Sequence, residues 1–158
     1  DIQLGTLSKS LGSVGGYVAA NSTIIDYLVN MSRSFIFSTA LSPADIGAAL
    51  AALQIIESDS FVLRRLQDNV NYMTDCLNSM GIYATNETPI FPILIGSNED
   101  TLAVSNHLYN AEIIGTAIRP PTVPVGESRI RLTVTAAHNR EQIDYVCRTL
   151  DKAIKALS

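Results

Sequence analysis

The sequence is poor in the features that mark several large classes of protein. Its 158 residues include only two cysteines, Cys76 and Cys147, which lie far apart and form no CxxC pair. This spacing argues against a zinc site and against a disulfide framework, so we predict two free, partly buried thiols and no metal. The apolar runs fall short of the roughly 20 residues that a membrane helix needs. No basic, apolar leader opens the chain, and we expect a cytoplasmic protein with no membrane partner.

Charge is also sparse, since 16% of the residues are charged and the formal net charge is −4. The 11 basic residues are scattered along the chain, which predicts no nucleic-acid partner. Small molecules and protein surfaces are therefore the expected partners. The 47% of apolar residues is ample for a folded core.

The predicted elements change in character near residue 58. Before it, apolar spacing and Gly or Pro signals predict strands at 1–9 and 15–20, a helix at 23–33, a short strand or extended segment at 35–43 and an alanine-rich helix at 44–58. Ser42 is expected to cap the last of these helices, with Pro43 in its first turn. A long amphipathic helix follows at 59–80, ended by Gly81. Strands and helices then alternate through 82–86, 89–96, 99–112, 115–121, 128–136 and 140–157.

One lysine lies in an unusual setting, because Lys9 is surrounded by the glycine, serine and threonine residues of the run GTLSKSLGSVGG. A phosphate-binding P-loop requires a glycine directly before the lysine, but Ser8 occupies that position. The dinucleotide pattern GxGxxG is also absent. Two interpretations remain: an exposed lysine on a flexible loop, or a Schiff-base lysine whose neighbouring hydroxyls and amides hold a phosphate.

A fuller pattern extends along the chain. The run TLSKSLGSVGGY resembles the cofactor-lysine segment of the α-oxoamine synthases, which are pyridoxal-phosphate acyltransferases of fold type I. FIFSTALSPA resembles the family's second phosphate-contact segment, and RPPTVPVGESRIRLTVTAAH resembles its C-terminal signature. The resemblance implies an α/β fold, with the end of the cofactor domain in residues 1–58 and a small C-terminal α+β domain in residues 59–158.

The resemblance also implies roles for the residues of the first two segments. Lys9 would form the Schiff base with pyridoxal 5'-phosphate and then act as the catalytic base, while Thr6 would bind the cofactor phosphate. Ser38 and Thr39 would reach the phosphate in the neighbouring subunit, which implies a homodimer with shared active sites. Without the family pattern, Thr6 is a plain turn residue, and Ser38 and Thr39 serve turn and capping chemistry ahead of the next helix.

The third segment would hold the substrates. Arg129 and Arg131 alternate with aliphatic residues, so a strand there places both arginines on one face. A bare pattern of this kind fits solvated arginines, but the resemblance implies that Arg131 binds the α-carboxylate of an amino acid. Arg119 and Thr122 lie on a proline-stiffened loop that would contact the acyl substrate, and Arg119 suits a distal carboxylate. We assign no catalytic role to His107, expected at the surface, or to His138, expected to hydrogen-bond locally.

The implied reaction is the decarboxylative condensation of an amino acid with an acyl-CoA or acyl thioester to give an amino ketone. Within the family, the run AIRPPTVP resembles members that use L-alanine, and a family member that uses glycine and an acetyl group is the alternative. A non-catalytic dimerisation module that keeps the C-terminal fold is a further alternative. The family's ring-stacking histidine and its pyridine-pairing aspartate have no counterpart here, so we expect a C-terminal fragment that is inactive alone.

Overall fold

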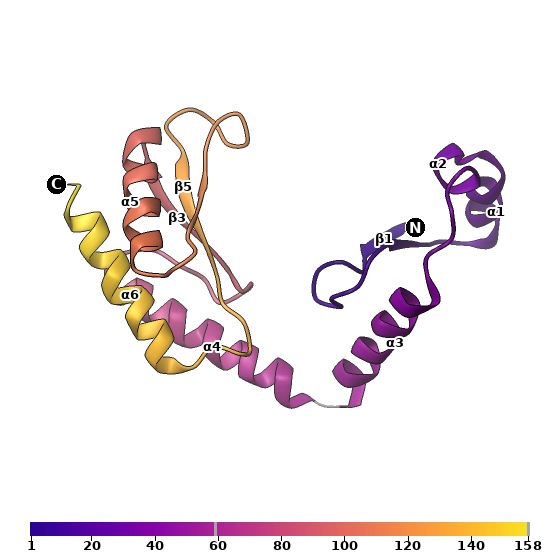
Figure 1. The fold of residues 1–158 in the computed structure, drawn as a ribbon, viewed down its shortest axis with the longest axis horizontal. Coiled ribbons are helices and arrows are strands. Elements are labelled where there is room, and N and C mark those ends of the chain that lie inside the picture. Colours follow the sequence, from indigo (N-terminus) through magenta and orange to yellow (C-terminus); the bar gives the residue numbers. More distant parts are fainter. Residues whose placement is uncertain (59, 158) are drawn as a thin grey trace. The chain divides into compact units, whose positions relative to one another are not determined.

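The computed structural model describes residues 1–58 and 60–157. Asp59, predicted to begin both the second domain and the long helix, and Ser158, predicted to end that domain, lie outside the described residues. The chain divides into two compact units, Asp1–Ser60 and Phe61–Ser158 (Figure 1). Each unit is described here by itself.

The first unit begins with a β-hairpin and continues as helices. Strands β1 (Gln3–Thr6) and β2 (Gly16–Ala19) pair antiparallel, with Thr6 opposite Gly16. Helices α1 (Ser22–Met31), α2 (Arg33–Ile36) and α3 (Pro43–Ser58) follow. The predicted start of α3 is confirmed, because Ser42 Oγ accepts a hydrogen bond from Asp45 N at 3.2 Å and Pro43 is the first helical residue.

Of the two alternatives predicted for 35–43, the strand is wrong, because Phe35 and Ile36 end the short helix α2 and no strand follows before α3. Residues 37–42 belong to no helix or strand. Ile36 N donates to Ser32 O at 2.9 Å and Phe37 N donates to Arg33 O at 3.0 Å, which are helical bonds. The guanidinium of Arg33 lies 5.8 Å from the centre of the Phe37 ring, a contact that one helical turn allows and an extended strand does not. The apolar pattern alone could not distinguish these two conformations.

The first unit has almost no core of its own. Of its described residues, only Ala49 is buried, at 5% exposure. Many of the large apolar side chains on the hairpin and on all three helices are exposed, among them Leu4 at 80% and Phe35 at 64%. Because such exposure is rare on a free protein surface, this unit presents apolar faces that other protein would cover.

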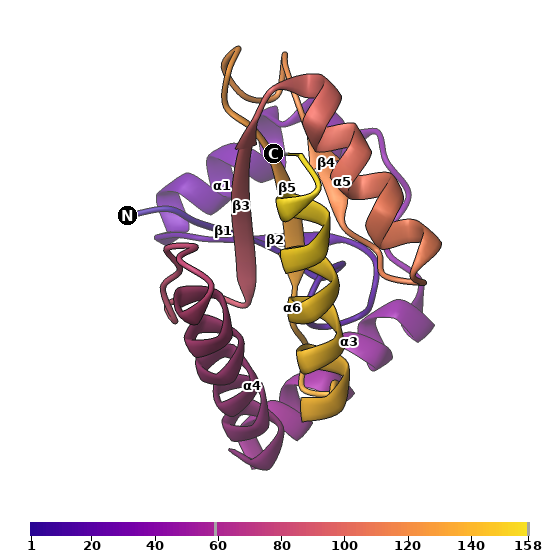
Figure 2. The same cartoon turned by 90° about the vertical axis from the view of Figure 1, so that its left-hand side faces the viewer.

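The second unit is a sheet covered on one face by helices (Figure 2). The long helix α4 (Ser60–Ser79) leads into β3 (Ile90–Gly96), α5 (Asn98–Asn110), β4 (Thr116–Ile118), β5 (Ser128–Thr133) and α6 (Arg140–Lys155). The strand order is β3-β5-β4, and both outer strands run antiparallel to β5. Helix α5 therefore connects the two parallel outer strands across the central one.

The helices and the sheet share one hydrophobic core. Its fully buried side chains come from α4, β3, α5, β5 and α6, and include Leu77, Phe91, Leu108, Ile130 and Leu150. Helix α4 ends as predicted: Gly81 has φ +79°, and Ile82 N donates to Leu77 O at 3.0 Å. The helices therefore cover one face of the sheet, and the residues of the other face are supported by this common core.

The strand predicted at 82–86 is also wrong, since this segment joins no sheet. Side chains of α4 satisfy its main chain instead. Asn78 accepts from Ala84 N at 3.0 Å and donates to Ala84 O at 3.3 Å, while Thr74 Oγ1 donates to Thr85 O at 3.2 Å. With its polar groups paired in this way, the segment needs no partner strand.

Within the described ranges, no single helix is long and apolar enough to cross a membrane. Helices α3 and α4 reach the required length and composition only when they are taken together as a broken span.

Candidate functional site

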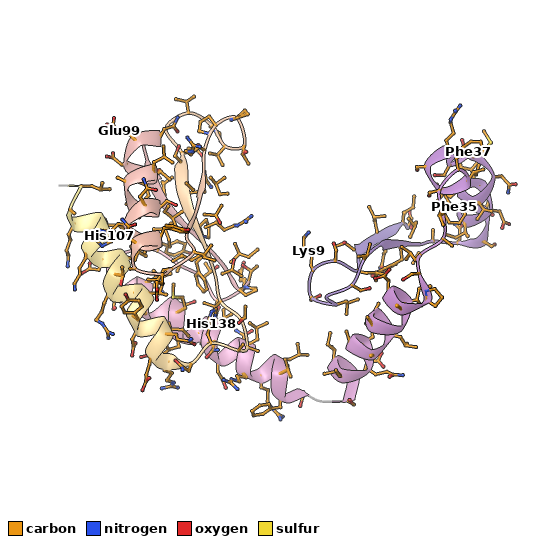
Figure 3. All side chains as sticks on the ribbon, in the orientation of Figure 1. Lys9, Phe35, Phe37, Glu99, His107 and His138 are labelled. Atoms are coloured by element: carbon orange, nitrogen blue, oxygen red, sulfur yellow. The ribbon has the colours of Figure 1, made fainter. Side chains whose placement is uncertain are left out.

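Lys9 lies in the loop that joins the two strands of the hairpin (Figure 3). The loop is closed by main-chain bonds: Leu7 N donates to Gly15 O at 2.9 Å, Ser13 N to Leu7 O at 3.0 Å and Gly12 N to Lys9 O at 3.1 Å. The hydroxyl of Ser13 also donates to Asp45 O at 2.6 Å, which fastens the loop to the start of α3. The main chain of the loop is therefore ordered while the Lys9 side chain stays exposed.

Two glycines are needed for this loop. Gly15 has φ +115°, and a Cβ atom there would lie 2.6 Å from Leu41 Cδ1. A Cβ atom on Gly16 would lie 2.9 Å from Gly5 O on the opposite strand. A side chain at position 16 would push the two strands apart, and one at position 15 would be strained by the positive φ and would displace Leu41, so the GG pair of the sequence motif is a packing requirement.

The groups beside Lys9 are hydroxyls and main-chain amides. Thr6 Oγ1 and Ser8 Oγ are 2.8 Å apart, and Ser8 N donates to Thr6 Oγ1 at 3.2 Å. Across residues 1–58 and 60–157, the Lys9 amine has neither a hydrogen-bond partner nor an acidic partner. An unpaired amine next to hydroxyl donors fits a cofactor that carries an aldehyde and a phosphate.

Ser38 and Thr39 are exposed and follow α2 in the same unit. Ser38 Oγ donates to Ser34 O at 2.6 Å, and no hydrogen bond among the described residues joins Ser38 or Thr39 to the Lys9 loop. Figure 3 shows the neighbouring Phe35 and Phe37 at the other end of this unit from Lys9. The structure therefore does not bring the two predicted phosphate contacts together within one copy of the chain.

Arg131 lies on the open face of the sheet in the second unit. It is exposed in the central strand β5, between Pro92 of β3 and Thr116 of β4. Ile130 and Leu132 face the helices at 0% and 4% exposure, as the alternation predicted. No side-chain partner of Arg131 is found in the part of the chain that the structure describes, so its guanidinium is available to a ligand.

The other arginine of β5, Arg129, is bound by Glu127, which the sequence analysis did not single out. Arg129 Nη2 donates to Glu127 Oε2 at 2.8 Å, and Arg129 Nε donates to Glu127 O at 2.9 Å. The only sequence signal was an acid two residues before an arginine, at the entry to a strand. That spacing is too common to indicate a contact by itself.

Arg119 and Thr122 are both exposed on the connection between β4 and β5. Thr122 N donates to Arg119 O at 3.0 Å, which closes a turn around a cis peptide bond between Pro120 and Pro121. The loop is thus a defined turn that carries one cation at its start.

The two histidines lie in different environments. His107 is exposed on α5, as predicted. His138 Nδ1 accepts a hydrogen bond from Thr135 N at 3.0 Å, which confirms the predicted local bond. His138 and Arg131 both line a cavity of about 770 Å³ in the second unit, together with Tyr145.

The two cysteines are free, as predicted, but only Cys76 is partly buried. Cys147 is buried at 2% exposure, and its Sγ donates to Met73 Sδ at 3.6 Å. Burial raises the pKa of the Cys147 thiol far above its usual range, and the nearby thiol of Cys76 adds to the effect. This thiol is a core group rather than a nucleophile. No cluster of three or more metal-ligating side chains occurs among the residues described.

Comparison with known proteins shows the family to which the chain belongs. The family model described as aminotransferase class I and II matches residues 1–150. The chain is 40% identical, over its whole length, to an 8-amino-7-oxononanoate synthase of Thermoanaerobacter pseudethanolicus, of which it covers 40%. It is 44% identical, over 98% of its length, to a protein of the same name from Maricaulis maris, of which it covers 38%. The chain thus spans about two fifths of these relatives.

Solved structures have the same fold. A structure of serine palmitoyltransferase with its pyridoxal-phosphate internal aldimine matches 99% of this chain with a TM-score of 0.91 and 26% identity, and the chain covers 40% of it. The 8-amino-7-oxononanoate synthase of Francisella tularensis matches 99% of the chain with a TM-score of 0.85 and 25% identity, and the chain covers 46% of it. The fold is therefore that of the fold type I transferases, as predicted. The chain belongs to the aminotransferase class I and II family, and its relatives place it among the α-oxoamine synthases.

Proposed function

We propose that this chain is the C-terminal part of a pyridoxal 5'-phosphate-dependent acyltransferase. The whole enzyme condenses L-alanine with an acyl-CoA or other acyl thioester, releases carbon dioxide and forms an amino ketone, as in the 8-amino-7-oxononanoate synthase step of biotin biosynthesis. The observation that carries the proposal is the unpaired amine of Lys9 on a glycine-built hairpin. It occurs in a chain that is 40% to 44% identical to proteins of that name.

The first unit would hold the cofactor. When bound, the cofactor supplies an electron sink for the bonds at the α-carbon of the amino acid. Lys9 Nζ would bind its aldehyde carbon, and once released would move the proton at the substrate α-carbon. The Thr6 hydroxyl, 2.8 Å from that of Ser8, would donate to the phosphate.

The dimer is part of the same proposal. Ser38 and Thr39 would bind the phosphate in the neighbouring subunit, so each active site would use both copies of a homodimer. Two observations support this: Phe37, just before Ser38, lies away from Lys9 within its own unit, and the first unit buries only Ala49 among its described residues. The apolar faces of the hairpin and of α3 need a protein surface to cover them.

The second unit would hold the substrates. Arg131, without a partner among the described residues, would bind the α-carboxylate of the amino acid through its planar pair of donors. Arg119 and Thr122 would contact the acyl substrate, with Arg119 near a distal carboxylate such as that of a pimeloyl chain. We assign residues 1–58 to the end of the cofactor domain and residues 59–158 to the small C-terminal domain. The 158 residues alone would be inactive.

Substrate use by the full-length protein tests this proposal. With pyridoxal phosphate, L-alanine and a pimeloyl thioester, we expect release of the free thiol and of carbon dioxide, and neither from the Lys9→Ala variant. Release from glycine and acetyl-CoA instead would contradict the alanine assignment and indicate a glycine C-acetyltransferase. Release from neither pair would contradict the enzyme proposal and favour a non-catalytic dimerisation module.

A further inference from the structure

Glu127 holds one of the two arginines on β5 at two points. Its carboxylate accepts from Arg129 Nη2 at 2.8 Å, and its main-chain oxygen accepts from Arg129 Nε at 2.9 Å. The side chain of Arg129 keeps only 27% of its exposure, while that of Glu127 keeps 53%. Exposed ion pairs add little to folding stability, so the main effect of this contact is on the charge that Arg129 presents.

Arg129 and Arg131 lie on the same face of the strand, two residues and about 7 Å apart along it. Their cross-strand neighbours carry no charge: Leu94 and Ile118 beside the first, and Pro92 and Thr116 beside the second. The described residues provide Arg129 with a carboxylate and Arg131 with none. This face of the sheet therefore presents one compensated guanidinium and one free guanidinium.

This difference has a consequence for ligands. Two free guanidiniums at this spacing would bind a short dicarboxylate at two points, one carboxylate on each. With Glu127 in place, the guanidinium of Arg129 already binds a carboxylate. A ligand with a single carboxylate loses nothing by this arrangement, whereas a dicarboxylic ligand loses its second contact and meets the negative charge of Glu127.

We propose that Glu127 is a specificity-determining residue, which occupies Arg129 so that the site accepts monocarboxylic amino acids and rejects dicarboxylic ones. The inference rests on the proposed function, in which Arg131 binds the α-carboxylate of the amino acid. Glu127 touches no substrate and acts through Arg129, so it is a positioning residue.

Arginine labelling of the full-length protein tests the contact without any turnover. Phenylglyoxal modifies free guanidiniums, and tandem mass spectrometry of the peptide assigns the label to Arg129 or to Arg131. We expect Glu127→Gln to raise the labelling rate of Arg129 several-fold, with Arg148, exposed on α6, as the internal reference. An unchanged Arg129 rate would overturn the proposal.

Inhibition by L-aspartate, measured against L-alanine, tests the specificity. Glu127→Gln should lower the inhibition constant of L-aspartate about five- to tenfold, the gain from one exposed charge-assisted contact. Arg129→Gln alone should not lower the constant, because it removes the guanidinium and leaves the charge of Glu127, and the double variant E127Q/R129Q should return to about the wild-type value. A merely structural role of Glu127 would not be rescued by removing Arg129. Tighter inhibition that persists in the double variant would therefore overturn the proposal.

The two levels of the proposal fail differently. A wild-type protein that accepts no amino acid would refute the proposed function, and the specificity role with it. A wild-type protein that uses L-alanine, with the same L-aspartate constant in Glu127→Gln, would refute the role of Glu127 alone.

Discussion

Asn69 joins α4 to the loop after β5 through His138. Asn69 Nδ2 donates to His138 O at 2.8 Å and to Thr135 O at 3.0 Å, and the Asn69 side chain is nearly buried, at 7% exposure. One amide thus satisfies two main-chain oxygens of the segment that follows Arg131. Because the segment lines the same cavity as Arg131, this contact links the stability of the second unit to its candidate site.

Asn69→Ala should destabilise the second unit by about 1 to 3 kcal/mol, because it removes two part-buried hydrogen bonds, to Thr135 O and His138 O, from a buried side chain. Hydrogen exchange of the full-length protein, followed on peptides covering residues 128–147, should show faster exchange. Asn106→Ala, at an exposed position on α5, should change the free energy of unfolding derived from exchange by less than about 0.5 kcal/mol. Equal effects of the two variants would contradict the role given to Asn69.

Cys147 should make stability depend on pH in the alkaline range. Burial raises the pKa of this thiol in the folded state, whereas in the unfolded chain it ionises near about 8.5. The contribution of the protonated thiol to the free energy of unfolding is complete below that pH and is lost as the pH rises above it, because only the unfolded state then releases the proton. The loss should reach at most about 1.4 kcal/mol per pH unit.

Urea unfolding of the full-length protein between pH 7 and pH 10 measures this effect. Cys147→Ala should lower stability at pH 7 through the lost core contact, but its stability should fall less steeply above pH 8.5. Parallel pH profiles of the two proteins would contradict a buried, protonated thiol.

Arg131→Ala should raise the KM for the amino acid while leaving the Lys9 adduct with the cofactor in place. The loss of a bidentate charge-assisted contact corresponds to about ten- to a hundredfold. Steady-state kinetics against L-alanine measure it, and Arg148→Ala, exposed on α6, is the matched control. An unchanged KM would remove Arg131 from the substrate site.

Thr39→Ala should weaken cofactor retention. Mixed dimers show whether Thr39 binds the cofactor of its own subunit or that of the neighbouring subunit. In a dimer of one Thr39→Ala chain and one Lys9→Ala chain, the remaining active site combines Lys9 of the first chain with Thr39 of the second. We expect that site to bind pyridoxal phosphate with wild-type affinity in equilibrium dialysis. An affinity as weak as that of the Thr39→Ala homodimer would show that Thr39 acts within its own chain.

The sequence predicted those elements whose signals are local. Ser42 and Pro43 mark the start of α3, Gly81 marks the end of α4, and the alternation around Ile130 gives the buried face of β5. These signals work because a cap, a positive φ angle and a period of two are properties of the segment itself.

The two wrong strands had causes outside their own segments. The main chain of residues 82–86 is hydrogen-bonded to side chains of Asn78 and Thr74 in the preceding helix. Phe37 ends a helical turn in which the Arg33 guanidinium packs over its ring. The contact of Glu127 with Arg129 was likewise not predicted, because a side-chain pair at this spacing depends on how the strand begins. Lys9, by contrast, could be singled out because its glycine and hydroxyl neighbours are contiguous in the chain.

Borohydride trapping of the full-length protein tests the central claim most directly. After incubation with pyridoxal phosphate and reduction, the adduct should lie on Lys9, within the peptide of residues 1–33, and the near-visible absorbance band should be lost in Lys9→Ala. The 158-residue chain alone should give at most weak labelling spread over its lysines. An adduct on Lys152 or Lys155 of the full-length protein would show that Lys9 is a solvated loop residue and that the assignment of the hairpin is wrong.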